Sequence, residues 1–319
     1  MIKKFIPVLV LGVAVGCGPT ETKVAESTPA ETPAVEPAKG ESAEPVEPAE
    51  PVKSKLPEWA AEVDLSKVDV RAEVERAGKL LDDARENFMT RYKAANKEEK
   101  IAMRNEYPEP TEYVAHVRRL IDARDDDQNI SAAYAFVVSR GGMRSPDQSG
   151  MMDILFEKFP ESEDLKEVVF PLIYGQMSQM TEDRLDIMIK SPVKDVQGLG
   201  TYAKAEFLKR LGEMQPRLDE VKKNPQMAAA MGDLEFIASR EIKDGELESL
   251  YESIVENFSD VELMEKSLGA MAEGALFAIK YLSVGKEAPD IEGNDLDGEA
   301  FSLSEYRGKV VMLDFWGDW

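Results

Sequence analysis

The sequence predicts a mainly α-helical protein that continues into the first strands of a smaller α/β domain. From Pro57 to Ser283, apolar residues recur three or four positions apart and strand signals are nearly absent. After Gly285 this spacing gives way to short apolar stretches separated by an Asp-Gly dipeptide. We therefore expect a helical domain over residues 57–284 and the N-terminal part of an α/β domain over residues 285–319.

Capping signals and apolar stripes place the individual helices. Ser66-Lys-Val-Asp69 is a capping-box pattern, and the stripe that follows predicts the first long helix: Val70, Val74, Ala77, Leu81, Ala84 and Phe88. A second stripe is formed by Tyr113, Val117, Leu120 and Ile121. Further starts are indicated at Ser145-Pro146, Ser162, Ser191-Pro192 and Ser259, and the last of these helices is expected to extend from Val261 to Leu282.

One internal similarity bears on how the helices are arranged. Leu155-Phe-Glu-Lys-Phe159 and Ile254-Val-Glu-Asn-Phe258 share one pattern: two apolar residues, a glutamate, a polar residue and a phenylalanine. A helix-capping signal follows each stretch. Their separation is about three helix pairs of tetratricopeptide length, although the units between them lack the typical pattern of that repeat. An irregular helical bundle and a tetratricopeptide-like region are both consistent with this spacing.

The stretch after Gly285 predicts a hairpin and then a buried strand. Asp297-Gly298 is a turn dipeptide, because both residues tolerate positive φ, and it separates expected strands over 291–296 and 300–303. Ser302-Leu-Ser-Glu305 can form one capped turn. The apolar, β-branched run from Val310 to Phe315 then has the length and composition of a strand that is buried on both faces.

These residues resemble a known family. Gly285-Lys-Glu-Ala-Pro-Asp290, followed by Gly308-Lys-Val-Val-Met-Leu-Asp-Phe-Trp-Gly-Asp-Trp319, is similar to the opening of a thioredoxin-like domain of the envelope thiol-disulfide reductase or redoxin type. The resemblance covers about the last tenth of the chain. In that family the next residue is the first cysteine of a Cys-x-x-Cys motif. We therefore expect the active-site cysteines after Trp319, and no activity from residues 1–319 alone.

The resemblance implies roles for residues near this expected motif. Asp314 would exchange a proton with the deeper cysteine, Trp316 and Trp319 would flank the active site, and no cofactor would be needed. A disulfide-bearing protein would be the substrate, and an upstream thiol reductant would supply electrons. A peroxiredoxin-type peroxidase is an alternative, although that family has a proline and a threonine ahead of its cysteine. The alternative to this family resemblance is that the apolar run from Val310 to Phe315 is ordinary core. Asp314 would then only mark the end of the strand, where its side chain meets water.

The N-terminus predicts export and anchoring. Lys3 and Lys4 precede an apolar run from Phe5 to Val15, which has the length of a signal peptide. Ala14-Val-Gly-Cys17 resembles a bacterial lipobox, although the family usually has leucine where Ala14 stands. Cys17 is the only cysteine of the chain and is the expected site of lipidation. A plain secretory signal is the alternative to this lipoprotein signal peptide over residues 1–17.

Residues 18–56 are rich in proline, alanine and glutamate and contain no aromatic residue. Such a segment cannot bury enough apolar surface to offset its ordering entropy, so we expect a disordered tether. With lipid on Cys17, the tether would hold the protein at a membrane on the periplasmic side of the cell envelope.

Composition narrows the remaining possibilities. The formal net charge of −23 argues against nucleic acid as a partner. His116 is the only histidine, so neither a Ser/His/Asp catalytic triad nor a metal site with several imidazole ligands is predicted. We expect it at a surface or boundary position. Asp125-Asp-Asp127 fits a solvated helix end, and the methionines fit core packing better than a peptide-binding groove. The alternative to an enzyme is a non-catalytic helical-repeat lipoprotein that binds a protein partner.

Overall fold

The computed structural model describes residues 58–61, 63–141, 146–295 and 297–314. The chain divides into two compact units, at the step from Ser283 to Val284. The first is helical apart from one small hairpin, and the described part of the second contains a hairpin and one helical turn. The predicted fold class is therefore confirmed. That residues 57–284 fold as an independent domain stays a prediction.

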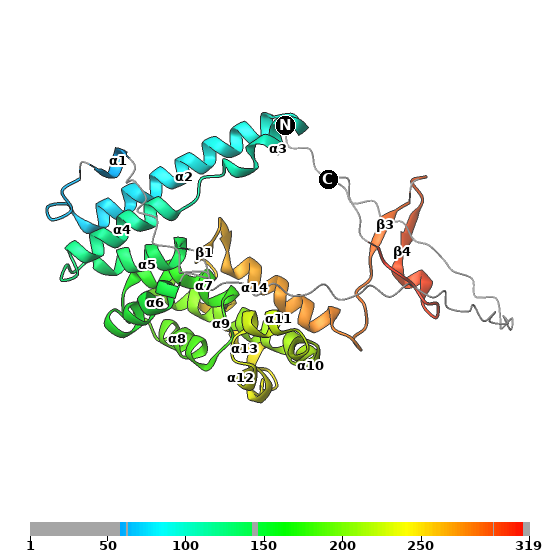
Figure 1. Ribbon diagram of the computed structural model, residues 1–319. Coiled ribbons are helices and arrows are strands. Elements are labelled where there is room, and N and C mark those ends of the chain that lie inside the picture. The colour runs from blue at the N-terminus through cyan, green and yellow to red at the C-terminus, as the bar shows by residue number, and fades with distance from the viewer. Residues whose placement is uncertain (1–57, 62, 142–145, 296, 315–319) are drawn as a thin grey trace, which may run out of the picture. The chain divides into compact units, whose positions relative to one another are not determined.

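The first unit is built from consecutive helices that pack mainly on their neighbours in the sequence (Figure 1). The elements of its first half are α1 Glu58–Ala61, α2 Val70–Ala94, α3 Lys97–Ala102, η1 Met103–Asn105, α4 Thr111–Ala123, α5 Ile130–Arg140, α6 Pro146–Lys158, η2 Glu163–Val168 and α7 Val169–Tyr174. Those of its second half are α8 Gln179–Ile189, α9 Lys194–Met214, η3 Gln215–Arg217, α10 Leu218–Lys222, α11 Pro225–Met231, α12 Leu234–Ser239, α13 Glu246–Asn257, β1 Glu262–Leu263, β2 Lys266–Ser267, α14 Leu268–Phe277 and the π-helical turn η4 Ala278–Leu282.

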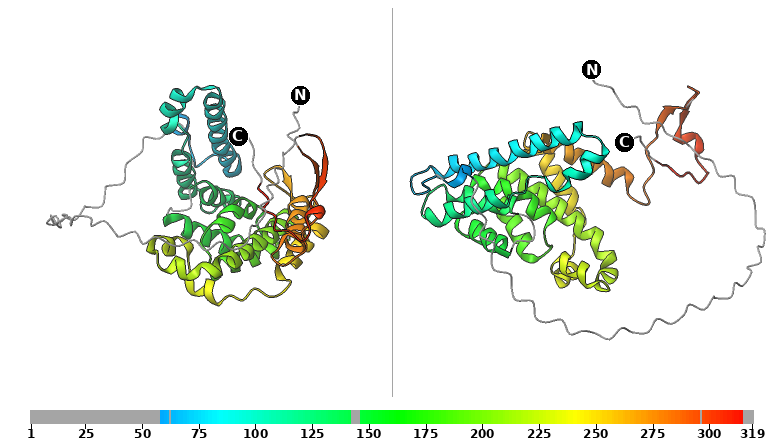
Figure 2. Two further views of the ribbon diagram at one scale, coloured as in Figure 1. Left: turned by 90° about the vertical axis from the view of Figure 1, so that its right-hand side faces the viewer. Right: turned by 45° about the horizontal axis from the view of Figure 1, so that its top comes forward.

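The core of this unit is centred on α5 and α9. Helix α5 packs against α2, α4 and α6, while α9 packs against α7, α8, α13 and α14. The second half of α2 and the short helix α3 extend beyond the rest of the helices, as Figure 1 and the left view of Figure 2 show. The predicted stripe of α2 is confirmed, because all its residues are buried except Ala84, which is half-buried.

Two predicted helix starts are wrong in position. Asp69, not Ser66, caps α2 and accepts a hydrogen bond from the Ala72 N–H at 2.8 Å, while the Ser66 hydroxyl donates to Asp64 at 2.6 Å. The last helix begins at Leu268 rather than near Val261, because Met264 and Glu265 adopt positive φ and turn the chain into the β1–β2 hairpin. The Ser267 hydroxyl then accepts from the Ala270 N–H and caps α14.

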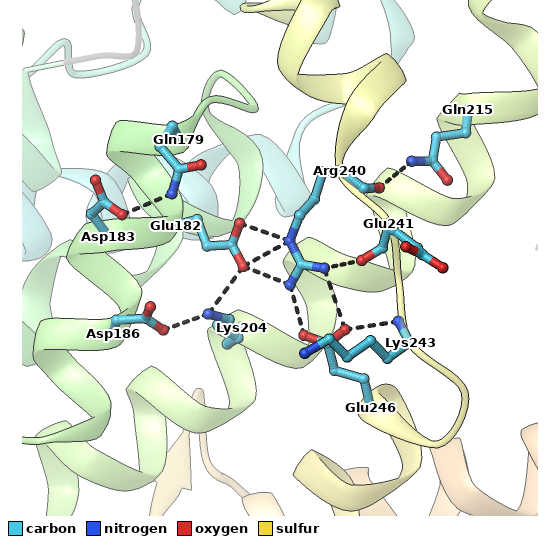
Figure 3. Close-up of polar contacts among 10 residues, drawn as sticks. All are labelled: Gln179, Glu182, Asp183, Asp186, Lys204, Gln215, Arg240, Glu241, Lys243 and Glu246. Atoms are coloured by element: carbon cyan, nitrogen blue, oxygen red, sulfur yellow. Dashed lines mark hydrogen bonds and ion pairs between the residues drawn. The ribbon is translucent and has the colours of Figure 1, made fainter.

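A buried network of charged side chains ties the segment between α12 and α13 to α8 and α9 (Figure 3). Glu182 accepts hydrogen bonds from Arg240, the shortest at 2.8 Å, and lies 3.1 Å from the Lys204 ammonium. Arg240 also reaches Glu246 at 2.6 Å, and Lys204 pairs with Asp186. Each charge has a partner of opposite sign, so loss of one partner would leave an uncompensated charge in a largely buried position.

Candidate functional site

The second unit begins with the predicted hairpin. Strands β3 Glu292–Asn294 and β4 Ala300–Ser302 pair antiparallel, with Gly293 opposite Phe301. Within the connecting turn, Gly298 adopts φ +85°, while the Asp295 carboxylate accepts from the Asp297 and Glu299 N–H groups at 2.9 Å. The dipeptide therefore works as predicted, although only its glycine takes the positive φ.

Asp290 connects the Ala-Pro-Asp segment to the helical turn η5 Leu303–Tyr306. Its carboxylate accepts hydrogen bonds from the Ser304 N–H at 2.8 Å and the Ile291 N–H at 3.1 Å. The hydrogen bonds from Ser304, and that from Ile291, lower the pKa of Asp290 below its usual value. Glu287 and Arg307 form an ion pair over the same turn. The sequence around Asp290 carries no local signal for this bridging role, because its partner Ser304 lies fourteen residues further along the chain.

A cavity of about 330 Å³ lies where this segment faces the residues after η5. Pro289, Tyr306 and Leu313 supply apolar walls, and Asp290, Arg307 and Lys309 supply charged ones. Within the described residues, no group of three or more metal-ligating side chains is close enough to hold an ion.

Of the predicted site residues, only Asp314 falls within the described part of the chain. Its side chain is exposed. Trp316, Trp319 and the lipidation residue Cys17 lie outside the described residues. The structure therefore does not test whether Asp314 and the two tryptophans form one site.

The predicted doubly buried strand over 310–315 is wrong for the residues that are described. Residues 310–314 form no regular strand, and Val310 and Met312 are 97% and 78% exposed. A strand becomes buried only when neighbouring strands and helices cover both of its faces. The described part of this unit supplies just the β3–β4 hairpin and η5, which leave Val310 and Met312 exposed, while Val311 and Leu313 are half-buried near η5.

Two further findings concern the rest of the described chain. The expected surface position of His116 is wrong, because its side chain is fully buried beside Glu73. Among the described helices, none is both long and apolar enough to cross a membrane.

Comparisons with known proteins identify one family and a group of partly similar relatives. Residues 284–319 match the AhpC/TSA family. Thiol-disulfide oxidoreductase ResA of Geobacillus kaustophilus is 53% identical over 38 residues, which are 12% of this chain and 22% of the relative. ResA of Bacillus anthracis is 45% identical over 58 residues, 18% of this chain and 34% of the relative, and ResA of Bacillus subtilis is 41% identical over 54 residues, 17% and 30%.

These matches cover a minority of each protein. The chain spans between about a fifth and a third of the length of the curated relatives it matches. No solved structure matches the chain significantly. The predicted resemblance is confirmed at the level of the family: residues 284–319 are redoxin-like in sequence and similar to part of the thiol-disulfide oxidoreductases.

Proposed function

We propose that this protein acts as a thiol-disulfide oxidoreductase of the bacterial cell envelope, anchored to a membrane by lipid on Cys17. The observation that carries the proposal is the redoxin-like sequence of residues 284–319, which ends in Asp314-Phe-Trp-Gly-Asp-Trp319. Its substrate would be a disulfide-bearing protein, and a separate thiol reductant would return the enzyme to the dithiol state.

The chemistry requires a pair of cysteines beyond the single Cys17. We place them directly after Trp319, at the start of a helix where the dipole and free N–H groups favour a thiolate. That thiolate attacks a sulfur of the substrate disulfide, and the mixed disulfide is resolved when the second thiol loses its proton and attacks. Asp314 would accept this proton, while Trp316 and Trp319 would flank the thiols. In this role Asp314 would lie beside the second thiol and be covered by the completed domain.

The tether and the helical unit would position this chemistry. Residues 18–56 would separate the anchor from the folded units, and residues 57–284 would recognise a protein partner. The helical unit lies outside the segment that matches the redoxin family, which favours a separate binding role for it. A non-catalytic lipoprotein that only binds a partner is the second candidate function.

The direct test of the proposed mechanism is the Asp314→Asn variant of the complete gene product, assayed by the reduction of insulin disulfides between pH 6 and 8. Loss of the proton acceptor should slow resolution of the mixed disulfide by about 100-fold, the usual scale of one acid–base group. Asp297→Asn is a matched control, because it removes an exposed carboxylate in the hairpin turn.

Wild-type rates for Asp314→Asn across this pH range would exclude the proton-transfer role. Turnover of hydrogen peroxide without reduction of insulin would instead favour the peroxidase. No activity with either substrate, together with capture of a protein partner by the helical unit, would favour the binding lipoprotein.

A further inference from the structure

The only histidine of the chain lies in a closed polar cluster within the helical unit. His116, on α4, is 0% exposed, and its Nε2 lies 2.5 Å from Oε1 of Glu73 on α2. The other ring nitrogen, Nδ1, is buried and has no hydrogen-bond partner among the described residues. A neutral ring with its proton on Nε2 fits this site, because Nδ1 then carries no proton that needs an acceptor.

A cation already neutralises the carboxylate that faces this ring. The Arg76 guanidinium donates to both oxygens of Glu73, at 2.9 and 2.6 Å, and Arg119 lies near enough on α4 to disfavour further positive charge on His116. Protonation of His116 would therefore bury a second cation against Glu73. It would also leave the Nδ1–H without an acceptor, and a buried donor without an acceptor is costly.

The same residues hold the first helix of the described chain. The Trp59 ring of α1 meets the His116 ring edge-on at 4.9 Å and stacks on Tyr113 at 5.2 Å. Arg76 lies over the Trp59 ring at 5.1 Å and also donates to the Trp59 carbonyl at 3.4 Å. All the ring and polar contacts described for α1 therefore pass through His116, Tyr113 and Arg76, and the buried Ala60 adds packing.

We infer that His116, Glu73 and Arg76 form a pH-sensitive latch that holds α1 against α2 and α4 while the imidazole is neutral and releases it when the imidazole is protonated. Helix α1 begins at Glu58, just after the segment of residues 18–56 in the sequence. The latch therefore controls where the polypeptide before the helical unit is fastened.

The direction of the pH dependence follows from the environment of each group. Burial lowers the pKa of His116 below its ordinary value of 6.5, and outweighs the hydrogen bond and negative charge of Glu73, which act in the opposite direction. The latched state therefore binds fewer protons than the released state. Latching is strongest above about pH 6.5 and weakens as the pH falls below it, by at most about tenfold per pH unit for one proton.

Glu73 titrates outside this range. Burial alone would raise its pKa, but the hydrogen bonds from Arg76 and His116 and the positive charge of Arg76 bring it below its ordinary value of 4.5. Arg76 stays charged, because its hydrogen bond to Glu73 raises its pKa further. A transition between pH 5 and 7 in this cluster would therefore belong to His116.

The latch can be measured through Trp59. Replacing Trp316 and Trp319 by phenylalanine leaves Trp59 as the only tryptophan in the chain, whose emission and acrylamide quenching can be followed from pH 7.5 to 5.0. We expect Trp59 emission to shift to the red and quenching to increase several-fold with a midpoint below pH 6.5, while the far-ultraviolet circular dichroism of the helical unit is retained. His116→Gln should remove this transition, and Tyr113→Phe, which keeps a ring against Trp59, should retain it.

The single imidazole also permits a test that needs no substitution at His116. Proton NMR of the wild-type chain should show its resonance titrating below 6.5, together with the Trp59 transition. Trp59 emission that is constant from pH 7.5 to 5.0, a transition that survives in His116→Gln, or an imidazole that titrates at or above 6.5 would each overturn the latch. Under the proposed function, release would add α1 to the membrane tether, but these measurements need neither the lipid nor thiol chemistry.

Discussion

At the scale of single residues, charged side chains are tolerated in the helical core because each is paired. Burial would raise the pKa of Glu182, but the hydrogen bonds and positive charges of Arg240 and Lys204 bring it below its ordinary value of 4.5. Folding therefore gains stability from this carboxylate above about pH 4.5, and that stability is lost as the pH falls through the lower pKa of the folded state.

The Arg240→Met variant tests the contribution of this network. Methionine keeps much of the side-chain volume but removes the guanidinium, so Glu182 retains only Lys204 as a charged partner. We expect the free energy of unfolding to fall by about 3 kcal/mol at pH 7, as measured by urea denaturation, because a buried carboxylate loses hydrogen bonds.

Lys79→Met is the matched control for Arg240→Met. It removes one member of the Lys79–Asp83 pair, whose side chains are 74% and 55% exposed. Such pairs contribute about 0–1 kcal/mol. Equal effects of the two substitutions would show that burial does not govern these ion pairs.

Residue types alone did not reveal these sites. A lone histidine among charged residues predicts a boundary position, but His116 is buried because Glu73 and Trp59 approach it from other helices. Likewise, Glu182 and Arg240 are brought together only by the packing of the α12–α13 segment on α8. Long-range partners of this kind have no local sequence signal.

At the scale of elements, the contact between α8 and α9 depends on a missing side chain. A Cβ atom on Gly200 of α9 would lie 2.5 Å from the Met188 Cβ and 3.0 Å from the Met188 carbonyl carbon. At these two distances the neighbouring atoms would have to move, and the Met188 carbonyl carbon belongs to the backbone of α8. The small residue therefore allows these helices to pack closely.

We expect Gly200→Ala to lower the free energy of unfolding by about 2 kcal/mol, because overpacking must separate the two helices. Gly274→Ala in α14 is the matched control, since its added Cβ would meet no atom within 4 Å apart from its chain neighbours and the backbone of its own helix. There the greater helix propensity of alanine should stabilise the protein by about 0.5–1 kcal/mol. Thermal denaturation of both variants measures these effects, and a stabilising Gly200→Ala would contradict the close packing.

The spacing of apolar residues predicted which helices and strands form. It was less successful for the residues where they begin and for whether other elements bury them. The stripe from Val70 to Phe88 and the Asp297-Gly298 hairpin both agree with the structure, because each depends on local spacing and turn chemistry. The stripe beginning at Val261 misplaced the start of α14, since Met264 and Glu265 form a turn of positive φ that their residue types do not favour. Val310 to Phe315 has the composition of a buried strand, but burial requires covering elements that composition does not supply.

At the scale of the whole molecule, the proposed membrane anchoring would depend on Cys17. If lipid on this residue holds the proposed tether, Cys17→Ser should move the protein from the membrane fraction to the soluble fraction or leave it unprocessed. Cell fractionation with detection of the helical unit measures this distribution. Equal membrane recovery of the wild type and the variant would contradict lipid anchoring.

The proposed function depends on the redoxin-like segment being part of a complete thiol-disulfide oxidoreductase. The most direct measurement is the rate of insulin disulfide reduction by the complete gene product, compared with residues 1–319 alone, which contain a single cysteine. We expect turnover by the complete product and none by residues 1–319. Failure of the complete product to reduce insulin or another protein disulfide, in the presence of a thiol reductant, would contradict it.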